Sequence, residues 1–178
     1  MKETILKILK LTLTLLIICA GVAAVLAGVN AITKDKIAAI QVEKTQQAIS
    51  QVLPDVSGLE QLTLSGDTGI VKSVYKADNG YAVEVAPNGF DGAVTMMVGI
   101  SDGKVTGISV ISHTETPGLG AVAAANNAKG EAFRGQFVGQ SGTLEIGNQI
   151  DAMSGATITS KAVVAGVNAA LEFVENLG

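Results

Sequence analysis

The chain has 178 residues and a net charge of −4, which leaves room for one ordinary domain and some additional structure. Residues 37–178 hold 7 basic and 14 acidic side chains, a net charge of −7, so we expect no nucleic acid as a partner. Cys19 and His113 are the only residues of their types. This composition excludes an internal disulfide and argues against a metal site, so redox chemistry would need an organic cofactor.

The first predicted element is a membrane-spanning helix within residues 1–33. Residues 11–33 carry no charge, and 23 helical residues are long enough to cross about 30 Å of hydrocarbon. A cleaved signal peptide is the alternative, but its apolar region is usually only about 7–15 residues long. Three lysines and one glutamate precede the span. This bias favours a single pass through the cell membrane, with the N-terminus in the cytoplasm and the remaining chain outside.

Residues 34–69 are predicted to form a helical stalk and a connection. Apolar residues recur at helical spacing as far as Val52 and Leu53, and Pro54 is expected to end the helix. Residues 55–69 are rich in turn formers. We therefore expect a connection there, with room for one short strand.

From residue 70 to 178 the sequence predicts one α+β domain. Alternating apolar residues flank Asp78-Asn79-Gly80 and Asp102-Gly103, which indicates two hairpins and four antiparallel strands. Residues 121–137 look helical but loose, with an interruption at Gly130. An amphipathic helix is predicted over residues 161–177, lying on the sheet. The expected architecture is thus an antiparallel sheet packed with helices.

Three glycine-rich stretches mark places where the backbone must turn or let a flat ligand approach. They are residues 88–94, 112–120 and 151–164. The second leads into the spacing G-x-G-x-x-A, which begins at Gly118 and resembles a dinucleotide fingerprint. That fingerprint also needs a βαβ unit and an acidic residue about 20 positions later, and neither is evident. We therefore do not predict a nucleotide-binding fold.

Few side chains could catalyse a reaction. His113 and Glu115 would share one face of an extended segment and could form an acid–base pair, but without a third orienting group we favour polar walls of a loop. A hydrolase using Ser154 or Ser160 would lack the G-x-S-x-G elbow and would depend on the single histidine. We expect no catalytic residue in this chain.

Residues 154–160, Ser-Gly-Ala-Thr-Ile-Thr-Ser, carry four hydroxyl side chains just before the last predicted helix. One interpretation is a helix N-terminus with Ser160 as the N-cap. The same geometry could hold a phosphate, because free N–H groups and the positive end of a helix dipole attract an anion. The pattern alone leaves both possibilities open.

Residues 151–171, together with 89–112 and 112–120, resemble the covalent FMN-binding domain of two membrane proteins. These are the G subunit of the Rnf electron-transport complex and the C subunit of the sodium-pumping NADH:quinone reductase. The family motif is D-x-x-[ST]-G-A-[ST], and it is matched here by Asp151, Ser154, Gly155, Ala156 and Thr157. The resemblance implies that FMN is joined through its phosphate to the hydroxyl of Thr157.

The same resemblance implies further roles for the two loops. Ser154, Gly155 and Ala156 would contact the cofactor beside Thr157, and a flavin transferase with FAD as donor would recognise the segment that begins at Asp151. A second set of flavin contacts follows from the loop that borders the isoalloxazine ring in the family. This set consists of Glu115, Thr116, Gly118 and Leu119.

The implied function is electron transfer within an ion-translocating ferredoxin:NAD oxidoreductase, with no net catalysis by the isolated chain. Its partners would be the other membrane subunits, the flavin transferase and membrane lipid. The shortness of the chain favours the Rnf protein over its quinone-reductase counterpart. The alternatives are a membrane-tethered module that binds an anionic ligand without a covalent bond and an exported hydrolase that uses Ser154 and His113.

Overall fold

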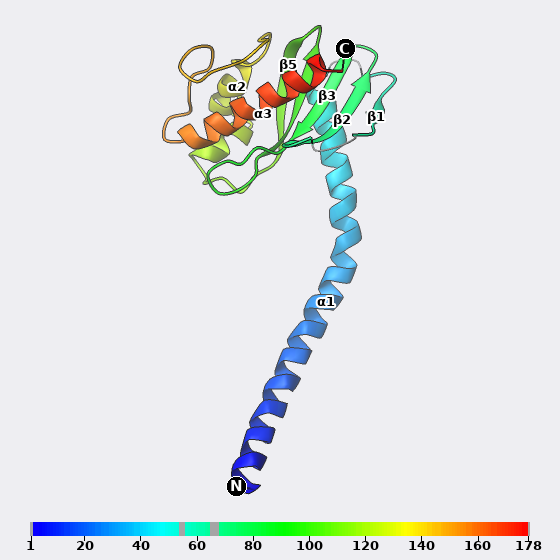
Figure 1. The fold of residues 1–178 in the computed structure, drawn as a ribbon, viewed down its shortest axis with the longest axis vertical. Coiled ribbons are helices and arrows are strands. Elements are labelled where there is room, and N and C mark those ends of the chain that lie inside the picture. Colours follow the sequence, from blue (N-terminus) through cyan, green and yellow to red (C-terminus); the bar gives the residue numbers. More distant parts are fainter. Residues whose placement is uncertain (1, 54–55, 65–67, 178) are drawn as a thin grey trace. The chain divides into compact units, whose positions relative to one another are not determined.

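The computed structural model describes residues 2–53, 56–64 and 68–177 (Figure 1). The chain divides into two compact units, residues 1–43 and 44–178. Helix α1 (Lys2–Val52) begins in the first unit and ends in the second. The predicted helix end at Pro54 lies outside the described residues.

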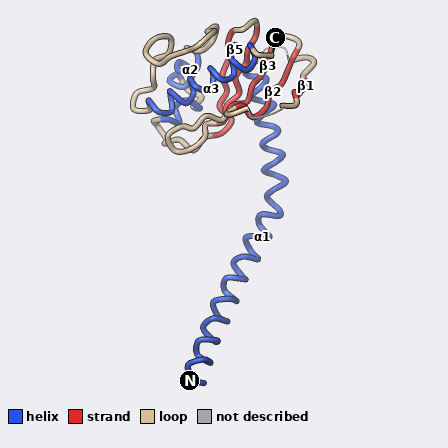
Figure 2. The backbone as a smooth tube through the Cα atoms, in the orientation of Figure 1, coloured by secondary structure: helices blue, strands red, loops and turns tan. Residues whose placement is uncertain are grey.

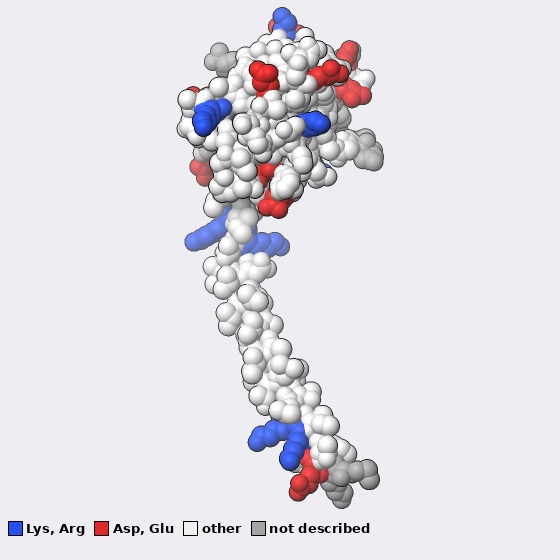
Figure 3. All heavy atoms as spheres, turned by 90° about the vertical axis from the view of Figure 1, so that its left-hand side faces the viewer, with Lys and Arg blue, Asp and Glu red and all other residues white. Residues whose placement is uncertain are grey.

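Within the first unit, α1 is an exposed apolar helix. Its charge-free stretch follows Lys7 and Lys10 and ends before Lys34 and Lys36. On the face drawn in Figure 3, no charged side chain interrupts the surface between the two groups of basic side chains along this helix. By length and composition, α1 and α3 (Thr157–Glu175) could each cross a membrane. The apolar window of α1 is fully exposed, whereas half of that in α3 is buried. This contrast identifies α3 as a core helix of the domain.

The second unit is built on a five-stranded antiparallel sheet in the order β1-β2-β3-β4-β5 (Figure 2). The strands are β1 (Glu60–Leu62), β2 (Val71–Ala77), β3 (Gly80–Val85), β4 (Thr95–Ser101) and β5 (Lys104–Ser112). Both predicted hairpins are confirmed. At the second turn Asp102 and Gly103 have φ values of 51° and 70°, as a two-residue hairpin turn requires. The short strand β1 forms one edge of the sheet.

The larger core lies between one face of the sheet and α3, which contacts β2, β3 and β4. Val83 and Met96 from the strands pack here with Val163 and Val167 from the helix. Gly166 lies against the sheet so closely that a Cβ atom would collide with Met96. The prediction that the last helix lies on the sheet is confirmed.

The opposite face of the sheet is covered by the last turns of α1. A second core forms here, and its buried residues are Ala48, Ile49, Val52, Leu53, Ala77, Ala82, Met97 and Ile111. Gly99 and Gly107 pair across β4 and β5, and a Cβ atom on Gly99 would collide with the carbonyl oxygen of Val52. Thr106 donates its hydroxyl to the same oxygen. Residues 44–52, predicted only as part of a stalk, therefore belong to the domain, and Ala48, Ile49 and Val52 lie in its core.

Residues 121–137 are largely helical, as predicted, but the predicted interruption at Gly130 is wrong. The region forms a 3₁₀ helix, η1 (Gly120–Ala124), and a separate helix, α2 (Ala128–Gly135). The break falls before α2 because Asn127 caps that helix and accepts hydrogen bonds from the N–H groups of Lys129 and Gly130, both at 3.1 Å. Gly130 lies inside α2, where a Cβ atom would collide with backbone carbonyl oxygens of the preceding turn.

The predicted start of the last helix is also wrong. Helix α3 begins at Thr157, four residues before the predicted Lys161, and its N-cap position is Ala156. Ser160 is not the N-cap. It is fully buried in the first turns, where its hydroxyl donates to Ala156 O and accepts from Met153 N, both at 2.9 Å. Ser160 thus holds the preceding loop against the helix from inside.

Candidate functional site

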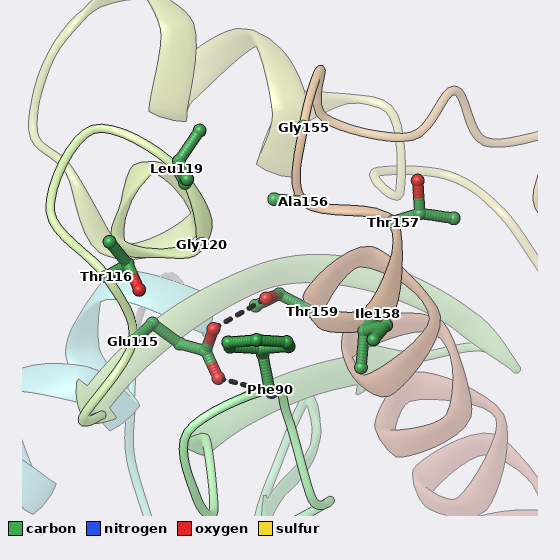
Figure 4. A pocket seen from close by; sticks show the side chains of 10 residues that line it. All are labelled: Phe90, Glu115, Thr116, Leu119, Gly120, Gly155, Ala156, Thr157, Ile158 and Thr159. Carbon is green, nitrogen blue, oxygen red and sulfur yellow. Dashed lines mark hydrogen bonds between the residues drawn. The ribbon is translucent and has the colours of Figure 1, made fainter.

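A cavity of about 330 Å³ opens where three loop segments meet the first turn of α3 (Figure 4). The segments come from the glycine-rich stretches 88–94, 112–120 and 151–164. The lining residues are Phe90, Glu115, Thr116, Leu119, Gly120, Gly155, Ala156, Thr157, Ile158 and Thr159. The fold thus brings together three stretches that are far apart in the sequence.

The four hydroxyls of residues 154–160 divide into two pairs. Ser154 and Thr157 are exposed, whereas Thr159 and Ser160 are 1% and 0% exposed. Figure 4 shows the Thr157 side chain projecting from the start of α3 and not toward Thr159 or Glu115. The exposed hydroxyls are available to a ligand or a modifying enzyme, and the buried ones are bonded within the protein.

The N-terminus of α3 has no side-chain cap. The N–H of Ser160 is the first to bond within the helix, to Ala156 O at 2.9 Å. Among the described residues, no partner accepts from the N–H groups of Thr157, Ile158 and Thr159. These free donors and the helix dipole make the lip of the cavity attractive to an anion. The two interpretations of this motif, a helix start and a phosphate seat, are therefore compatible.

Glu115 lies in the wall of the cavity and is only 5% exposed. Its Oε1 accepts hydrogen bonds from Phe90 N at 2.8 Å and Asp91 N at 3.3 Å, and its Oε2 accepts one from Thr159 Oγ1 at 2.6 Å. The side chain therefore joins two loops to α3. The sequence predicts a polar side chain in a loop wall. The structure shows in addition that this carboxylate is buried and holds separate segments together.

The structure separates the other predicted site residues into two groups. Thr116, Leu119, Gly155 and Ala156 line the same cavity as Glu115 and Thr157. The lining does not include Ser154, Gly118, Asp151 or His113. Asp151 is exposed, and its backbone N–H donates to Gln136 Oε1 at 2.7 Å. Nδ1 of His113 is buried without a partner among the described residues.

Sequence reasoning missed four lining residues, Phe90, Gly120, Ile158 and Thr159. Phe90 lies in one of the three glycine-rich stretches, but nothing in its local pattern assigns the side chain to a cavity. Thr159 could have been found, because the apolar stripe of α3 at Val163 and Val167 continues one turn backward to residues 159 and 160. That continuation would have placed both hydroxyls inside.

Three large apolar side chains at this cavity remain exposed: Phe90 at 69%, Leu119 at 44% and Ile158 at 53%. In Figure 4 they lie around the cavity on three different segments. An apolar rim beside free N–H groups suits a ligand with a flat apolar ring system and an anionic group. A flavin mononucleotide has both parts, so the residues present fit this cofactor.

Comparison with known proteins agrees with this chemistry. An FMN-binding domain family matches residues 89–172, and the RnfG N-terminal region matches residues 1–52. The G subunit of an ion-translocating oxidoreductase complex of Methanosarcina acetivorans is 33% identical, over 94% of this chain and 95% of that protein.

Two further relatives are similar over comparable lengths. The G subunit of a Na⁺-translocating ferredoxin:NAD⁺ oxidoreductase complex of Acetobacterium woodii is 35% identical over 96% of this chain and 93% of its own length. That of a proton-translocating complex of Clostridium ljungdahlii is 34% identical over 94% and 91%. The apolar helix α1 and these relatives identify a membrane-anchored protein with an FMN-binding domain. The chain belongs to the RnfG family, the G subunits of ion-translocating oxidoreductase (Rnf) complexes.

Proposed function

We propose that this chain carries electrons within an ion-translocating ferredoxin:NAD oxidoreductase complex, on FMN joined by a phosphoester bond to Thr157. The names of the relatives and the matching FMN-binding domain support this role. Bound FMN would supply one- and two-electron redox chemistry that no side chain of this protein can perform. The chain itself would bind and orient the cofactor, and net conversion of a substrate would require the partner subunits.

One observation carries the proposal: Thr157 is an exposed hydroxyl at the first position of α3, beside free N–H groups and the cavity. A phosphodiester at this position keeps one negative charge, and the helix N-terminus would stabilise that charge. The apolar side chains of Phe90, Leu119 and Ile158 would cover part of the ring system. Ser154, Gly155 and Ala156 would approach the phosphate from the preceding loop.

Formation of the bond would require a separate enzyme. The Thr157 hydroxyl is a weak nucleophile, and the nearby Glu115 already accepts three hydrogen bonds. We propose that a flavin transferase uses FAD. The threonine oxygen would attack the phosphorus of the FMN half, the pyrophosphate bond would break, and AMP would leave as the hydroxyl proton is released. Asp151 is exposed, which supports its proposed recognition by that enzyme.

Residues 154–161 lie in one tryptic peptide, residues 135–161, which allows a direct test of the linkage. We expect this peptide from native membranes to carry the mass of FMN less one water, located at Thr157 by fragmentation. The full chain should fluoresce under ultraviolet light after denaturing electrophoresis. Thr157→Val should abolish both signals, whereas Thr157→Ser, which keeps a hydroxyl, should retain them. A wild-type peptide without added mass would instead support a module that binds its anionic ligand non-covalently.

We further propose that α1 crosses the cell membrane once, with the N-terminus in the cytoplasm, where Lys7 and Lys10 contact anionic lipid. The FMN-binding domain would then lie outside the cytoplasm, where a covalent bond prevents loss of the cofactor. Protease added to intact spheroplasts should digest residues 44–178 while a cytoplasmic control protein survives. Digestion only after lysis would reverse the assigned orientation.

A further inference from the structure

The carboxyl group of Glu115 is the point at which the three segments of the cavity are joined. One oxygen accepts from the N–H groups of Phe90 and Asp91, and the other accepts from the Thr159 hydroxyl. All three partners donate. Within residues 2–53, 56–64 and 68–177, no cationic side chain forms an ion pair with this carboxylate. Its negative charge is therefore balanced by dipoles alone.

The backbone around the carboxylate is shaped to admit it. Gly89 and Gly120 each lie close to one oxygen: a Cβ atom on Gly89 would collide with Oε1, and one on Gly120 would collide with Oε2. A Cβ on Gly120 would also lie 2.6 Å from Thr159 Oγ1. Two glycines from separate stretches thus leave the space that the bonded carboxylate occupies. The backbone on both loops is therefore shaped to hold the Glu115 side chain in one position.

We propose that Glu115 is a positioning residue that holds the 88–94 loop and the first turn of α3 around the cofactor and that places a fixed negative charge in the cavity wall. Both of its oxygens already accept hydrogen bonds from the protein, and on this proposal it acts on the flavin through geometry and charge. The inference rests on the proposed FMN site. It adds a role that the resemblance does not assign.

The fixed charge has a definite consequence for the redox potential. Reduction adds negative charge to a flavin, and a nearby carboxylate in a poorly solvated wall opposes that addition. Glu115 therefore lowers the midpoint potential. The Thr159 hydroxyl and the two N–H groups moderate the effect, because they draw charge toward the protein side of the carboxylate.

The proposed role of Glu115 in holding the loops can be tested without the cofactor. Hydrogen exchange of the full chain in detergent should be measured after expression without the transferase. In Glu115→Ala the amides of Phe90 and Asp91 should exchange at least about tenfold faster, because each loses a charged acceptor. The matched control is Glu145→Ala, which removes an exposed carboxylate elsewhere in the domain and should leave both amides unchanged. Equal exchange in all three proteins would overturn the positioning role.

The proposed effect of the Glu115 charge on the redox potential is tested on the flavin-loaded chain. Glu115→Gln keeps the size of the side chain but removes the charge. Its one amide oxygen can still accept from Phe90 N and Asp91 N, while its NH₂ group would donate to the Thr159 hydroxyl, reversing that bond. We expect its midpoint potential to shift to a more positive value. Thr159→Val, which removes the bond to Oε2, should shift the potential to a more negative value, and Thr159→Ser should restore it. Glu145→Gln should have no effect.

The outcomes separate this inference from the proposed function. If Glu115→Gln carries a normal amount of FMN at the wild-type potential, the electrostatic role is wrong while the FMN site stands. An equal shift in Glu145→Gln would also overturn it, because net charge and not position would be responsible. If the wild-type chain carries no FMN, the proposed function fails, and the exchange experiment still decides whether Glu115 holds the loops.

Discussion

The two faces of the sheet are covered by helices in opposite ways. Against α3, the glycine that permits close contact is Gly166 of the helix, which lies over Met96. Against the end of α1, the glycines are Gly99 and Gly107 of the sheet, which lie under Val52. The sheet is adapted to receive α1, whereas α3 is adapted to fit the sheet.

The chain has no tryptophan and two tyrosines, and these report on the two faces separately. Tyr75 packs against the core under α1, and Tyr81 packs against the core under α3. In the flavin-free chain, Tyr81→Phe leaves Tyr75 as the fluorescent reporter of the α1 side. Tyr75→Phe leaves Tyr81 as the reporter of the α3 side. Each substitution below can be measured in both backgrounds by chemical unfolding.

The largest effect is expected for Gly99→Ala. Its Cβ would collide with the backbone of Val52, which cannot move aside as a side chain can, so the end of α1 must lift from the sheet. We expect a loss of about 3 kcal/mol in the free energy of unfolding, with the Tyr75 signal altered before the Tyr81 signal. Gly135→Ala is the control, since a Cβ there meets nothing within 4 Å. Wild-type stability in Gly99→Ala would mean that the contact on the α1 face is loose.

A smaller loss is expected for Gly166→Ala. The new methyl would meet Met96 Cε, Pro87 Cγ and Val85 Cγ2, and the flexible methionine can yield. Alanine also favours a helix by up to about 1 kcal/mol over glycine, so the net cost should be only about 1–2 kcal/mol. In a Met96→Ala background the cost of Gly166→Ala should disappear. Additive effects of the two substitutions would show that Met96 is not the obstacle.

The smallest effect is expected for Thr106→Val. This change removes the hydrogen bond to the Val52 carbonyl while keeping the shape of the side chain. We expect the free energy of unfolding measured through Tyr75 to fall by about 1 kcal/mol and that measured through Tyr81 to stay unchanged. Thr106→Ser should be close to wild type. If the valine variant alters the Tyr81 signal equally, the two faces of the sheet unfold as one unit.

Local patterns predicted the parts of the fold that depend on neighbouring residues. The turns at Asp78-Asn79-Gly80 and Asp102-Gly103 indicated the hairpins because turn chemistry and alternation act over a few positions. Packing of residues 44–52 on the sheet was not predicted. It depends on Gly99 and Gly107, whose role as a contact surface is invisible until the strands are paired.

The candidate site divides in the same way. The resemblance identified the motif around Thr157, and the structure places this exposed hydroxyl at the cavity. Local reasoning assigned Glu115 only to the polar wall of a loop, because a single acidic residue in a glycine-rich stretch gives no sign of burial. Its three partners come from positions up to 44 residues away, so only the folded chain reveals them.

The contact between Thr106 and Val52 joins residues 54 positions apart in the sequence. During synthesis the end of α1 is made well before β5, so the sheet surface that receives its buried residues is incomplete until both hairpins exist. Closing so long a loop is slow compared with forming a hairpin. The end of α1 therefore reaches its final packing only after the second hairpin has been made.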